Sequence, residues 1–332
     1  MMKLQHKNLI LYFILTAGII AGVIVIFNTH NSFGGGDNFA HYKFAHWGWK
    51  YPELLFNHWG KPVFTILISP FAQFGINSAR VFNLLMGFGT AIIIWDIAQS
   101  LKIKNSAISM LFVLTTPVYF SLMFTTLTEV SFSFFLALAV LLFFKKKYIL
   151  SAIAVSFLPL VRTEGIVLFP LFMIAYAQKK QWFAIPLITL GFWLISFLGF
   201  PFYDDYWWLI SKMPYSGNAK DIYGSGSLFH FIYNTKWILG YPLTGLFIIG
   251  LIIQFIKWLT IEKRQFTQSY FFLLLIPGSF FIFLAGHSLD HIKKLWIRIK
   301  TRILFIPIFY RYDTAKRSLS RINQTTITGR II

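Results

Sequence analysis

The chain has 332 residues, of which 57% are hydrophobic, 20% aromatic and only 12% charged. Soluble domains carry about 25% charged residues, so this composition excludes an ordinary water-soluble globular protein and favours a membrane protein. The chain contains no cysteine, which excludes a disulfide framework, a thiolate nucleophile and a cysteine-ligated metal. The net charge of +19 comes from basic residues grouped at the ends of apolar runs, so we expect no nucleic-acid partner.

A transmembrane helix needs about 20 predominantly apolar residues. We predict a retained anchor at residues 9–27, since no small-residue cleavage site precedes the next loop. The remaining predicted spans are residues 81–98 (with a re-entrant or half-span at 63–74 before it), 107–124, 130–144, 149–177 with a break at 162–164, 183–200, 239–259 and 270–285. They predict an all-α polytopic membrane protein with about 8–10 transmembrane helices.

The lysine and arginine clusters orient these spans, because short cytoplasmic loops carry the excess of positive charge. One side then holds the basic groups near residues 3–7, 102–104, 145–147, 179–180 and 257–264. The other side, the outer face, holds long loops at residues 28–62 and 201–240, which we expect to carry short interfacial helices. Seven of the 11 acidic residues lie on that outer side: Asp37, Glu53, Glu129, Glu164, Asp204, Asp205 and Asp221. Such a gathering of acids is expected of an active site that faces outward.

The C-terminal segment breaks the pattern. Residues 1–286 form the predicted membrane domain, whereas residues 287–332 form a basic tail with ten Lys or Arg and two acids. With nine spans before it, this tail would lie outside, against the positive-inside bias. Either the span count is wrong by one, or a truncation or frame change near residue 288 has replaced the native continuation.

Four outer segments carry motifs: GGGDN at 34–38, HWGKP at 58–62, TTLTE at 125–129 and RTEG at 162–165. Together they resemble the GT-C glycosyltransferases, over about residues 9–286. The resemblance implies a mannosyltransferase-like enzyme that moves a sugar from a polyprenyl-phosphate donor to a lipid, glycan or protein acceptor at the outer face of the cell (inner) membrane. It also implies that Asp37 is the base. The second acid usual in that family is absent, since Asn38 follows Asp37, which argues against a metal-bridging pair.

Chemistry supports Asp37 independently. A carboxylate that accepts the proton of an attacking hydroxyl typically contributes about 10²- to 10⁴-fold in rate, and a phosphate leaves without protonation. Glycines before Asp37 allow a tight turn beside it. The alternative reading is that Asp37 caps a helix over the following FAHYKFAHWGW, and the two roles are compatible. If Asp37 is not the general base, Asp205 is the next candidate.

Other residues of the outer face are candidates for substrate or phosphate binding. His41 is an i, i+4 partner of Asp37 on a helix and is expected to orient it or to contact phosphate. Arg162 offers a bidentate fork for a lipid phosphate, with Glu164 steadying it. Glu129 and Lys61 complete the set. Purely structural roles are the alternatives: Arg162 can snorkel at a helix end, and Glu129 can be an exposed acid favoured by the helix dipole.

Two further candidate sites involve aromatic residues and histidines. Four histidines lie in the first outer loop, so a divalent cation is possible, but their spacing matches no closed ligand set and we assign no metal ligand. In the second outer loop, FYDDYWW is expected to form a short interfacial helix capped by Asp204 or Asp205. The alternative prediction for this loop is that Tyr203, Trp207 and Trp208 stack on a sugar. Arg80 is a weaker phosphate candidate.

Alternatives to the glycosyltransferase remain open: a polysaccharide polymerase or ligase, another polytopic transporter, or a structural membrane subunit. A transporter would place ionisable groups in the middle of its spans and show repeated halves. In this chain only Asp96 approaches a span interior.

The predicted topology is testable with reporter fusions. Fusions after Lys147 and after Lys180 should report the cytoplasm, whereas fusions at Ser32 and Ser216 should report the outer side, because the lysine clusters hold the first pair inside. An outer-side signal at Lys147 would contradict the orientation and, with it, the gathering of acids on one face.

Overall fold

In the computed structural model, residues 2–29, 35–213, 230–260, 270–271 and 274–282 are described. Within them the chain is helical and contains no β-strand, which confirms the all-α prediction. The chain divides into two compact units, one of residues 1–224 and 231–283 and the other of residues 225–230 and 284–332. Nearly all described residues belong to the first unit, and the predicted basic tail at 287–332 lies outside them.

The helices follow one another along the chain with short connections. In order they are α1 (Met2–Asn28), α2 (Gly35–Trp47), η1 (Pro52–Phe56), α3 (Pro62–Ala72), α4 (Ile76–Ser100), α5 (Ile108–Leu114), α6 (Pro117–Leu122), α7 (Glu129–Phe144), α8 (Tyr148–Ser156), α9 (Leu158–Val161), η2 (Thr163–Leu168), α10 (Phe169–Gln178), α11 (Ala184–Leu187), α12 (Leu190–Tyr203), α13 (Trp208–Ser211), α15 (His230–Ile238) and α16 (Tyr241–Thr260). The predicted apolar runs up to residue 259 overlap these helices, the run at 270–285 is only partly described, and the predicted break at 162–164 lies between α9 and α10.

One predicted span is two helices. The run at 107–124 is interrupted before Pro117, where Thr116 adopts an extended conformation with ψ of 115°. A residue that precedes proline is pushed out of the helical region, and proline suits the first position of the next helix. Proline therefore ends α5 and begins α6.

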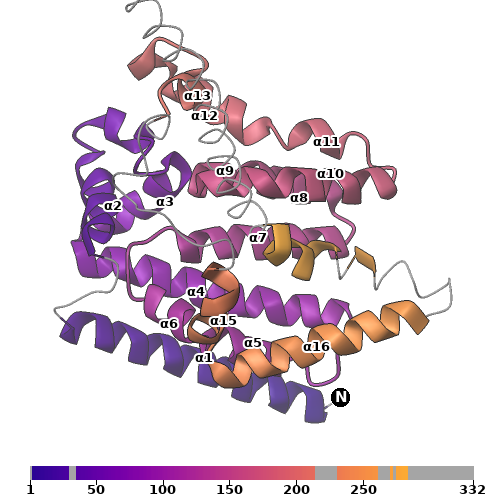
Figure 1. Cartoon of the computed structure of the whole chain (residues 1–332). Coiled ribbons are helices and arrows are strands. Elements are labelled where there is room, and N and C mark those ends of the chain that lie inside the picture. The colour runs from indigo at the N-terminus through magenta and orange to yellow at the C-terminus, as the bar shows by residue number, and fades with distance from the viewer. Residues whose placement is uncertain (1, 30–34, 214–229, 261–269, 272–273, 283–332) are drawn as a thin grey trace, which may run out of the picture. The chain divides into compact units, whose positions relative to one another are not determined.

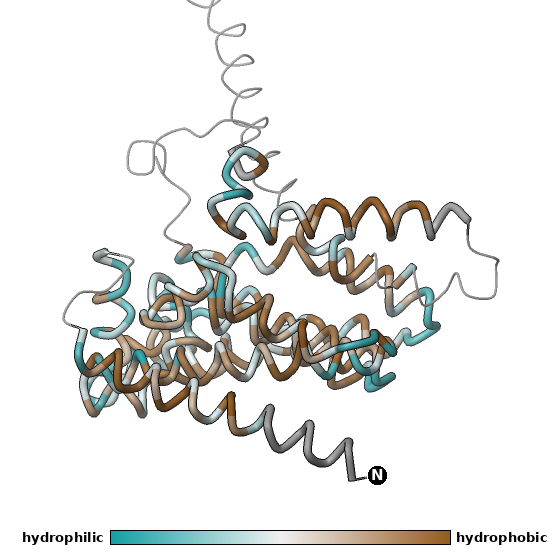
Figure 2. The backbone as a smooth tube through the Cα atoms, turned by 90° about the horizontal axis from the view of Figure 1, so that it is seen from below, coloured by the Kyte–Doolittle hydropathy of each residue, from teal (hydrophilic) through white to brown (hydrophobic). Residues whose placement is uncertain are grey.

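The long helices α4, α7 and α8 run side by side, with α2 and α3 gathered at one end of them (Figure 1). α7 begins at that end with Glu129, while its last turn lies at the opposite end, where Lys145 forms an ion pair with Asp96 of α4. The bundle therefore has two distinct polar ends. Figure 2 shows hydrophobic stretches in brown along the helices and hydrophilic ones in teal mainly where helices end.

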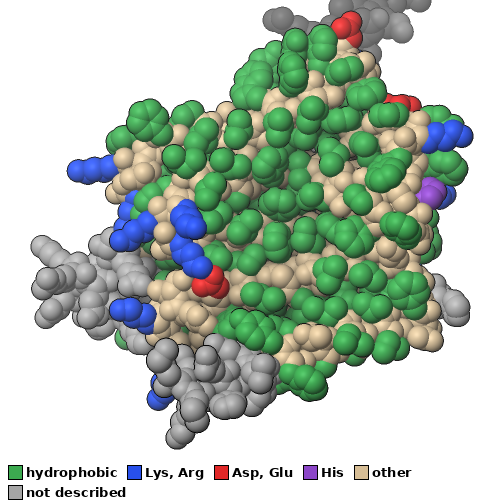
Figure 3. All heavy atoms as spheres, turned by 180° about the vertical axis from the view of Figure 1, so that it is seen from behind, with side chains coloured by type: hydrophobic (Ala, Val, Ile, Leu, Met, Phe, Trp, Pro, Cys, Tyr) green, Lys and Arg blue, Asp and Glu red, His purple; other side chains and the backbone are tan. Residues whose placement is uncertain are grey.

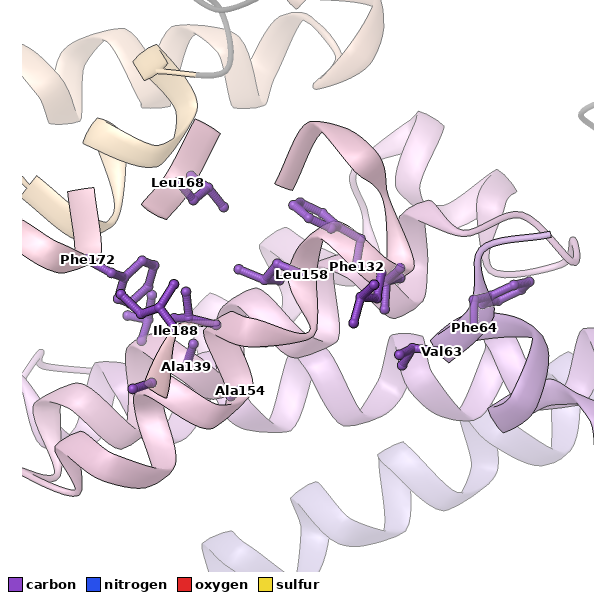
Figure 4. Packing of buried hydrophobic residues seen from close by; sticks show 14 of the residues in the cluster. Val63, Phe64, Phe132, Ala139, Ala154, Leu158, Leu168, Phe172 and Ile188 are labelled. Carbon is purple, nitrogen blue, oxygen red and sulfur yellow. The ribbon is translucent and has the colours of Figure 1, made fainter. Parts of the chain in front are cut away.

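The interior is packed with aliphatic and aromatic side chains. Phe64 of α3, Leu158 of α9 and Phe172 of α10 are fully buried and belong to one cluster, which Figure 4 shows from close by. Ala139 of α7 and Ala154 of α8 let these helices approach closely. This packing fixes the ends of α3, α7 and α9 relative to one another.

Two helices, Ile76–Ser100 and Ala184–Tyr203, are long and apolar enough to cross a membrane, judged by length and composition. Only 28% of the second is buried. Trp193, Leu194 and Phe197 on it are exposed, and Figure 3 shows hydrophobic side chains over much of one face. Exposed apolar surface on this scale is rare on soluble monomers.

A non-helical segment before α7 is held by two buried asparagines. Asn83 of α4 donates from Nδ2 to the carbonyls of Thr125 (2.9 Å) and Leu127 (2.7 Å). Asn38 of α2 accepts at Oδ1 from the backbone nitrogen and the hydroxyl of Thr126, both at 2.6 Å. Asn38, Asn83, Thr125 and Thr126 have no exposed surface. We call this arrangement the asparagine clamp; it supplies partners for backbone groups that water does not reach.

The asparagine clamp predicts unequal effects of two matched changes. Asn83→Asp removes both donations and buries a carboxylate beside two carbonyls, so it should lower the free energy of unfolding by at least about 3 kcal/mol. Asn38→Asp keeps an oxygen for both Thr126 donors and should cost less than half as much. Chemical denaturation in detergent micelles measures both values. Equal losses would show that the direction of these hydrogen bonds is unimportant.

Candidate functional site

The six residues predicted for the site come together at one end of the bundle. Asp37 and His41 lie on α2, Lys61 precedes α3, Glu129 begins α7, Arg162 lies between α9 and η2, and Glu164 lies in the first turn of η2. Ion pairs, a hydrogen bond and electrostatic coupling link these residues, as set out below. Segments more than a hundred residues apart in sequence therefore build one polar cluster.

Arg162 is the centre of this cluster. Its Nη1 forms an ion pair with Oε1 of Glu129, and its Nη2 lies 3.1 Å from Oε1 of Glu164. Burial tends to lower the pKa of Arg162, but the charges of Glu129 and Glu164 outweigh it and raise that pKa. Burial likewise tends to raise the pKa of Glu164, and Arg162 lowers it on balance. Arg162 and Glu164 are therefore both charged at neutral pH.

This pairing changes the role predicted for Arg162. Each terminal nitrogen of the guanidinium already holds a carboxylate, so a phosphate that approaches Arg162 must share this guanidinium with Glu129 and Glu164. In the structure Arg162 fixes the two carboxylates relative to each other.

The RTEG turn depends on its glycine. A Cβ atom at Gly165 would lie 2.6 Å from the carbonyl carbon of Leu158, closer than real contacts allow. The backbone nitrogen of Gly165 donates to the carbonyl of Arg162 at 2.8 Å, and that of Arg162 donates to Leu158 at 2.9 Å. Glycine therefore permits the tight turn that places Arg162 and Glu164 side by side.

Lys61 joins this turn from another segment. Its Nζ donates to the hydroxyl of Thr163 at 2.9 Å. Its backbone has φ of 64°, a left-handed conformation that is unfavourable for a side chain with a Cβ. Burial, with a smaller contribution from Arg162, lowers the pKa of Lys61 to about 8, although Glu164 opposes this shift. The amine is therefore mostly protonated at pH 7 and titrates just above it.

His41 lies beneath the cluster and is only 7% exposed. Its ring meets the ring of Phe64 edge-on, with centroids 5.5 Å apart, and it forms a hydrogen bond with the backbone of Gly60. Burial lowers the pKa of His41 to about 4, although Asp37 and Glu129 act to raise it. The imidazole is therefore neutral at pH 7, and its Nδ1 has no hydrogen-bond partner.

Asp37 lies in the first turn of α2 with an exposed side chain, and within the described residues it forms no hydrogen bond or ion pair. The following helix was predicted, but Asp37 lies inside its first turn and is not the capping residue before it. Its carboxylate faces the positive end of the α2 dipole and couples electrostatically to His41, four residues later. An accessible carboxylate in this position suits a base that must reach a substrate proton.

Several important residues were missed by sequence reasoning. Asn38 was noted only as a missing second acid, yet the asparagine clamp uses it to hold the chain just before Glu129. Thr163, the partner of Lys61, was not singled out. Arg80, a weaker phosphate candidate, is buried and donates to Asn77 at 3.0 Å. Only knowledge of the contacts reveals these roles.

The second outer segment contacts the first, and it corrects one prediction. Trp208 is fully buried, with Tyr203 stacked on it at 4.3 Å and its Nε1 donating to the carbonyl of Ser196 at 3.2 Å. Trp208 therefore cannot stack on a sugar, because its ring faces are covered by the protein. His58 approaches its carbonyl at 2.9 Å and packs against the same indole.

Asp205 lies in the turn that leads into the short helix α13, but the capping residue is Trp207, so the predicted cap by Asp204 or Asp205 is wrong. The carboxylate of Asp205 accepts from the backbone nitrogen of Trp207 at 2.7 Å and from the hydroxyl of Ser211 at 2.5 Å. These hydrogen bonds lower the pKa of Asp205, which makes it a weaker base. Lys220 and Asp221 lie outside the described residues.

Metal binding finds no site in the part of the chain that the structure describes, since no three His, Asp or Glu side chains lie close enough together to hold an ion. Comparison of the chain with protein-family models, with curated proteins and with solved structures found no match.

The low pKa of His41 predicts a pH dependence of stability. Between the folded value of about 4 and the usual value of 6.5, the unfolded state binds more protons, so stability must fall as the pH falls through this window. Replacing His41 by Gln removes this contribution. Between pH 7.5 and 4.5 the wild type should lose about 2 kcal/mol more than the variant, measured by denaturant unfolding. Parallel pH profiles for the two proteins would contradict a buried neutral imidazole.

Proposed function

We propose that the protein is an integral membrane glycosyltransferase, similar to the GT-C enzymes, that moves a sugar from a polyprenyl-phosphate donor to a lipid, glycan or protein acceptor at the outer face of the membrane. The observation that carries this proposal is the convergence of the six polar residues at one end of an apolar helical bundle. Asp37 is the proposed general base.

The distribution of polar groups supports a membrane location. The cluster around Arg162 lies at the end of α7 that begins with Glu129, whereas Lys145 lies at the other end and pairs with Asp96. Lys146 couples to Lys179, which adds a second lysine-bearing loop to that opposite end. This separation of the Arg162 cluster from the loops of Lys145 and Lys179 supports the proposed orientation, as do the exposed apolar side chains of the bundle (Figure 3).

Short helices in series supply the remaining crossings in this proposal. Tyr148–Val161 and Thr163–Gln178 are each apolar and shorter than 18 residues, and they meet at the Arg162 turn. At about 1.5 Å per residue each covers most of a hydrocarbon core of about 30 Å. The polar turn between them then lies near the outer surface. The charged Arg162 is tolerated there because Glu129 and Glu164 pair with it.

Apolar cavities in the bundle suit a lipid-linked substrate. One, of about 560 Å³, lies among α5, α16 and residues 276–280 and is lined by residues such as Phe112, Leu246 and Phe280. A second, of about 320 Å³, shares Thr116 and Ile276 with it and continues toward α4 and α7. An isoprenoid chain is a fitting occupant, because its burial removes apolar surface from water or headgroups.

The proposed reaction is a direct inverting transfer. The acceptor oxygen forms a bond to the anomeric carbon as the bond from that carbon to the phosphate oxygen breaks, and the hydroxyl proton passes to Asp37. The leaving phosphate keeps the bonding electron pair and needs no proton. Lys61 provides positive charge for it, since Arg162 is already held by two carboxylates.

A transporter is less well supported. Ionisable groups of a transporter lie near the middle of its spans, at the substrate site. In the described residues the charged pairs Asp96–Lys145 and Glu129–Arg162 lie near helix ends. A polysaccharide polymerase or ligase shares the chemistry and stays the alternative.

The proposal is tested by incubating the purified chain in detergent with a panel of polyprenyl-phosphate sugars and crude acceptor lipids, and then following carrier-dependent sugar transfer. Transfer from one of these donors is the expected result. Turnover with diphosphate-linked oligosaccharides alone would favour the polymerase or ligase instead.

The role of Asp37 predicts a specific loss. Asp37→Asn keeps size and polarity, so insertion and stability should change by under about 1 kcal/mol. Transfer should fall by at least about 100-fold, because the base is lost. Asp205→Asn is the matched control, since Asp205 is also exposed and acidic but accepts hydrogen bonds from Trp207 and Ser211, and transfer should fall far less. Near-normal transfer by Asp37→Asn with loss in Asp205→Asn would assign the base to the second outer loop.

A further inference from the structure

Within the part of the chain that the structure describes, two buried hydrogen-bond acceptors of the cluster have no donor. They are Nδ1 of His41 and Oε2 of Glu129. The other carboxylate oxygen of Glu129 is held by Arg162, and the His41 ring bonds to the backbone of Gly60. A buried polar atom without a partner typically costs about 1–3 kcal/mol, so each of these atoms calls for an explanation.

The two acceptors lie on segments that the asparagine clamp brings together. The clamp joins α2 to the non-helical segment before α7 through Asn38 and Thr126. His41 lies one helical turn after Asn38 on α2, and Glu129 is the first residue of α7, three residues after Thr126. The charge of Glu129 acts on the His41 ring, which is consistent with their proximity.

The chemistry of the missing partner follows from these atoms. A carboxylate oxygen only accepts, and a neutral imidazole whose other nitrogen donates to the Gly60 carbonyl presents Nδ1 as a bare acceptor. The partner must therefore donate. A phosphate oxygen only accepts at neutral pH, and a metal ion lacks a third ligand in the described residues. Hydroxyl groups satisfy the requirement.

We propose that His41 Nδ1 and Glu129 Oε2 accept hydrogen bonds from two hydroxyl groups of a hexose ring. The inference rests on the proposed function only in taking the hydroxyl-bearing ligand to be a sugar. His41 is then a positioning residue that holds the sugar beside Asp37. It is not a phosphate contact, and the phosphate is left to Lys61.

Two variants of His41 separate this role from a structural one. In His41→Asn the side-chain oxygen occupies roughly the place of Nδ1, so the acceptor stays while the bond to Gly60 is lost. In His41→Gln the amide reaches roughly the place of the other ring nitrogen, so the bond to Gly60 stays while the acceptor is lost. A sugar-binding role and a packing role therefore predict opposite orders of effect.

The experiment uses the full-length chain in detergent with methyl hexopyranosides of the manno, gluco and galacto series and their monodeoxy forms. Binding is followed by saturation-transfer NMR titration, and the unfolding midpoint of each variant confirms its fold. At least one parent sugar should bind, and one deoxy position should weaken its binding about tenfold. His41→Gln should bind the parent sugar about tenfold more weakly and lose that deoxy penalty, whereas His41→Asn should keep both within about threefold.

Three results would overturn the inference: no parent sugar binds the wild type, His41→Gln keeps the deoxy penalty, or His41→Asn loses binding while His41→Gln keeps it. Sugar binding that depends on His41 without transfer from any polyprenyl donor would remove the proposed function and leave this inference standing. Transfer that is unchanged in His41→Gln would do the reverse.

Discussion

The asparagine clamp is the constraint on which the rest of the site depends. Between α6 and α7 the chain leaves the helical conformation while it is buried, so its carbonyls and amides need partners from other helices. Asn83 and Asn38 provide them from α4 and α2. The clamp thereby fixes where α7 begins, and Glu129 is the first residue of that helix.

Charged contacts link Glu129 to the other residues of the cluster and hold them in place. Arg162 binds Glu129 and Glu164. Lys61 donates to Thr163, the residue between Arg162 and Glu164 in the sequence. The contacts of Arg162 with Glu129 and of Lys61 with Thr163 join segments that are distant in sequence, so the cluster is placed by the fold before any ligand arrives. Fixed dipoles and charges of this kind need little reorganisation when charge develops during a reaction.

Sequence reasoning identified which polar residues matter because they stand out at the ends of apolar runs. Asp37, Glu129 and Arg162 were visible for that reason, and the helix after Asp37 was expected from the preference of aspartate for the start of a helix. Their mutual pairing was not visible, since an arginine held by two carboxylates and an arginine open to phosphate have the same sequence. Trp208 was misread for a similar reason: an aromatic residue in a polar loop looks exposed until the partner that covers it, Tyr203, is known.

The left-handed backbone of Lys61 has a consequence for how this site can evolve. Glycine is the residue that adopts φ of 64° without strain, and a lysine there costs of order 1 kcal/mol or more. A substitution of Lys61 by glycine would therefore remove the backbone strain of the loop but would also remove the amine. Lysine at this position lowers the stability of the fold but supplies a positive charge to the site. Stability and chemistry therefore favour different residues at position 61.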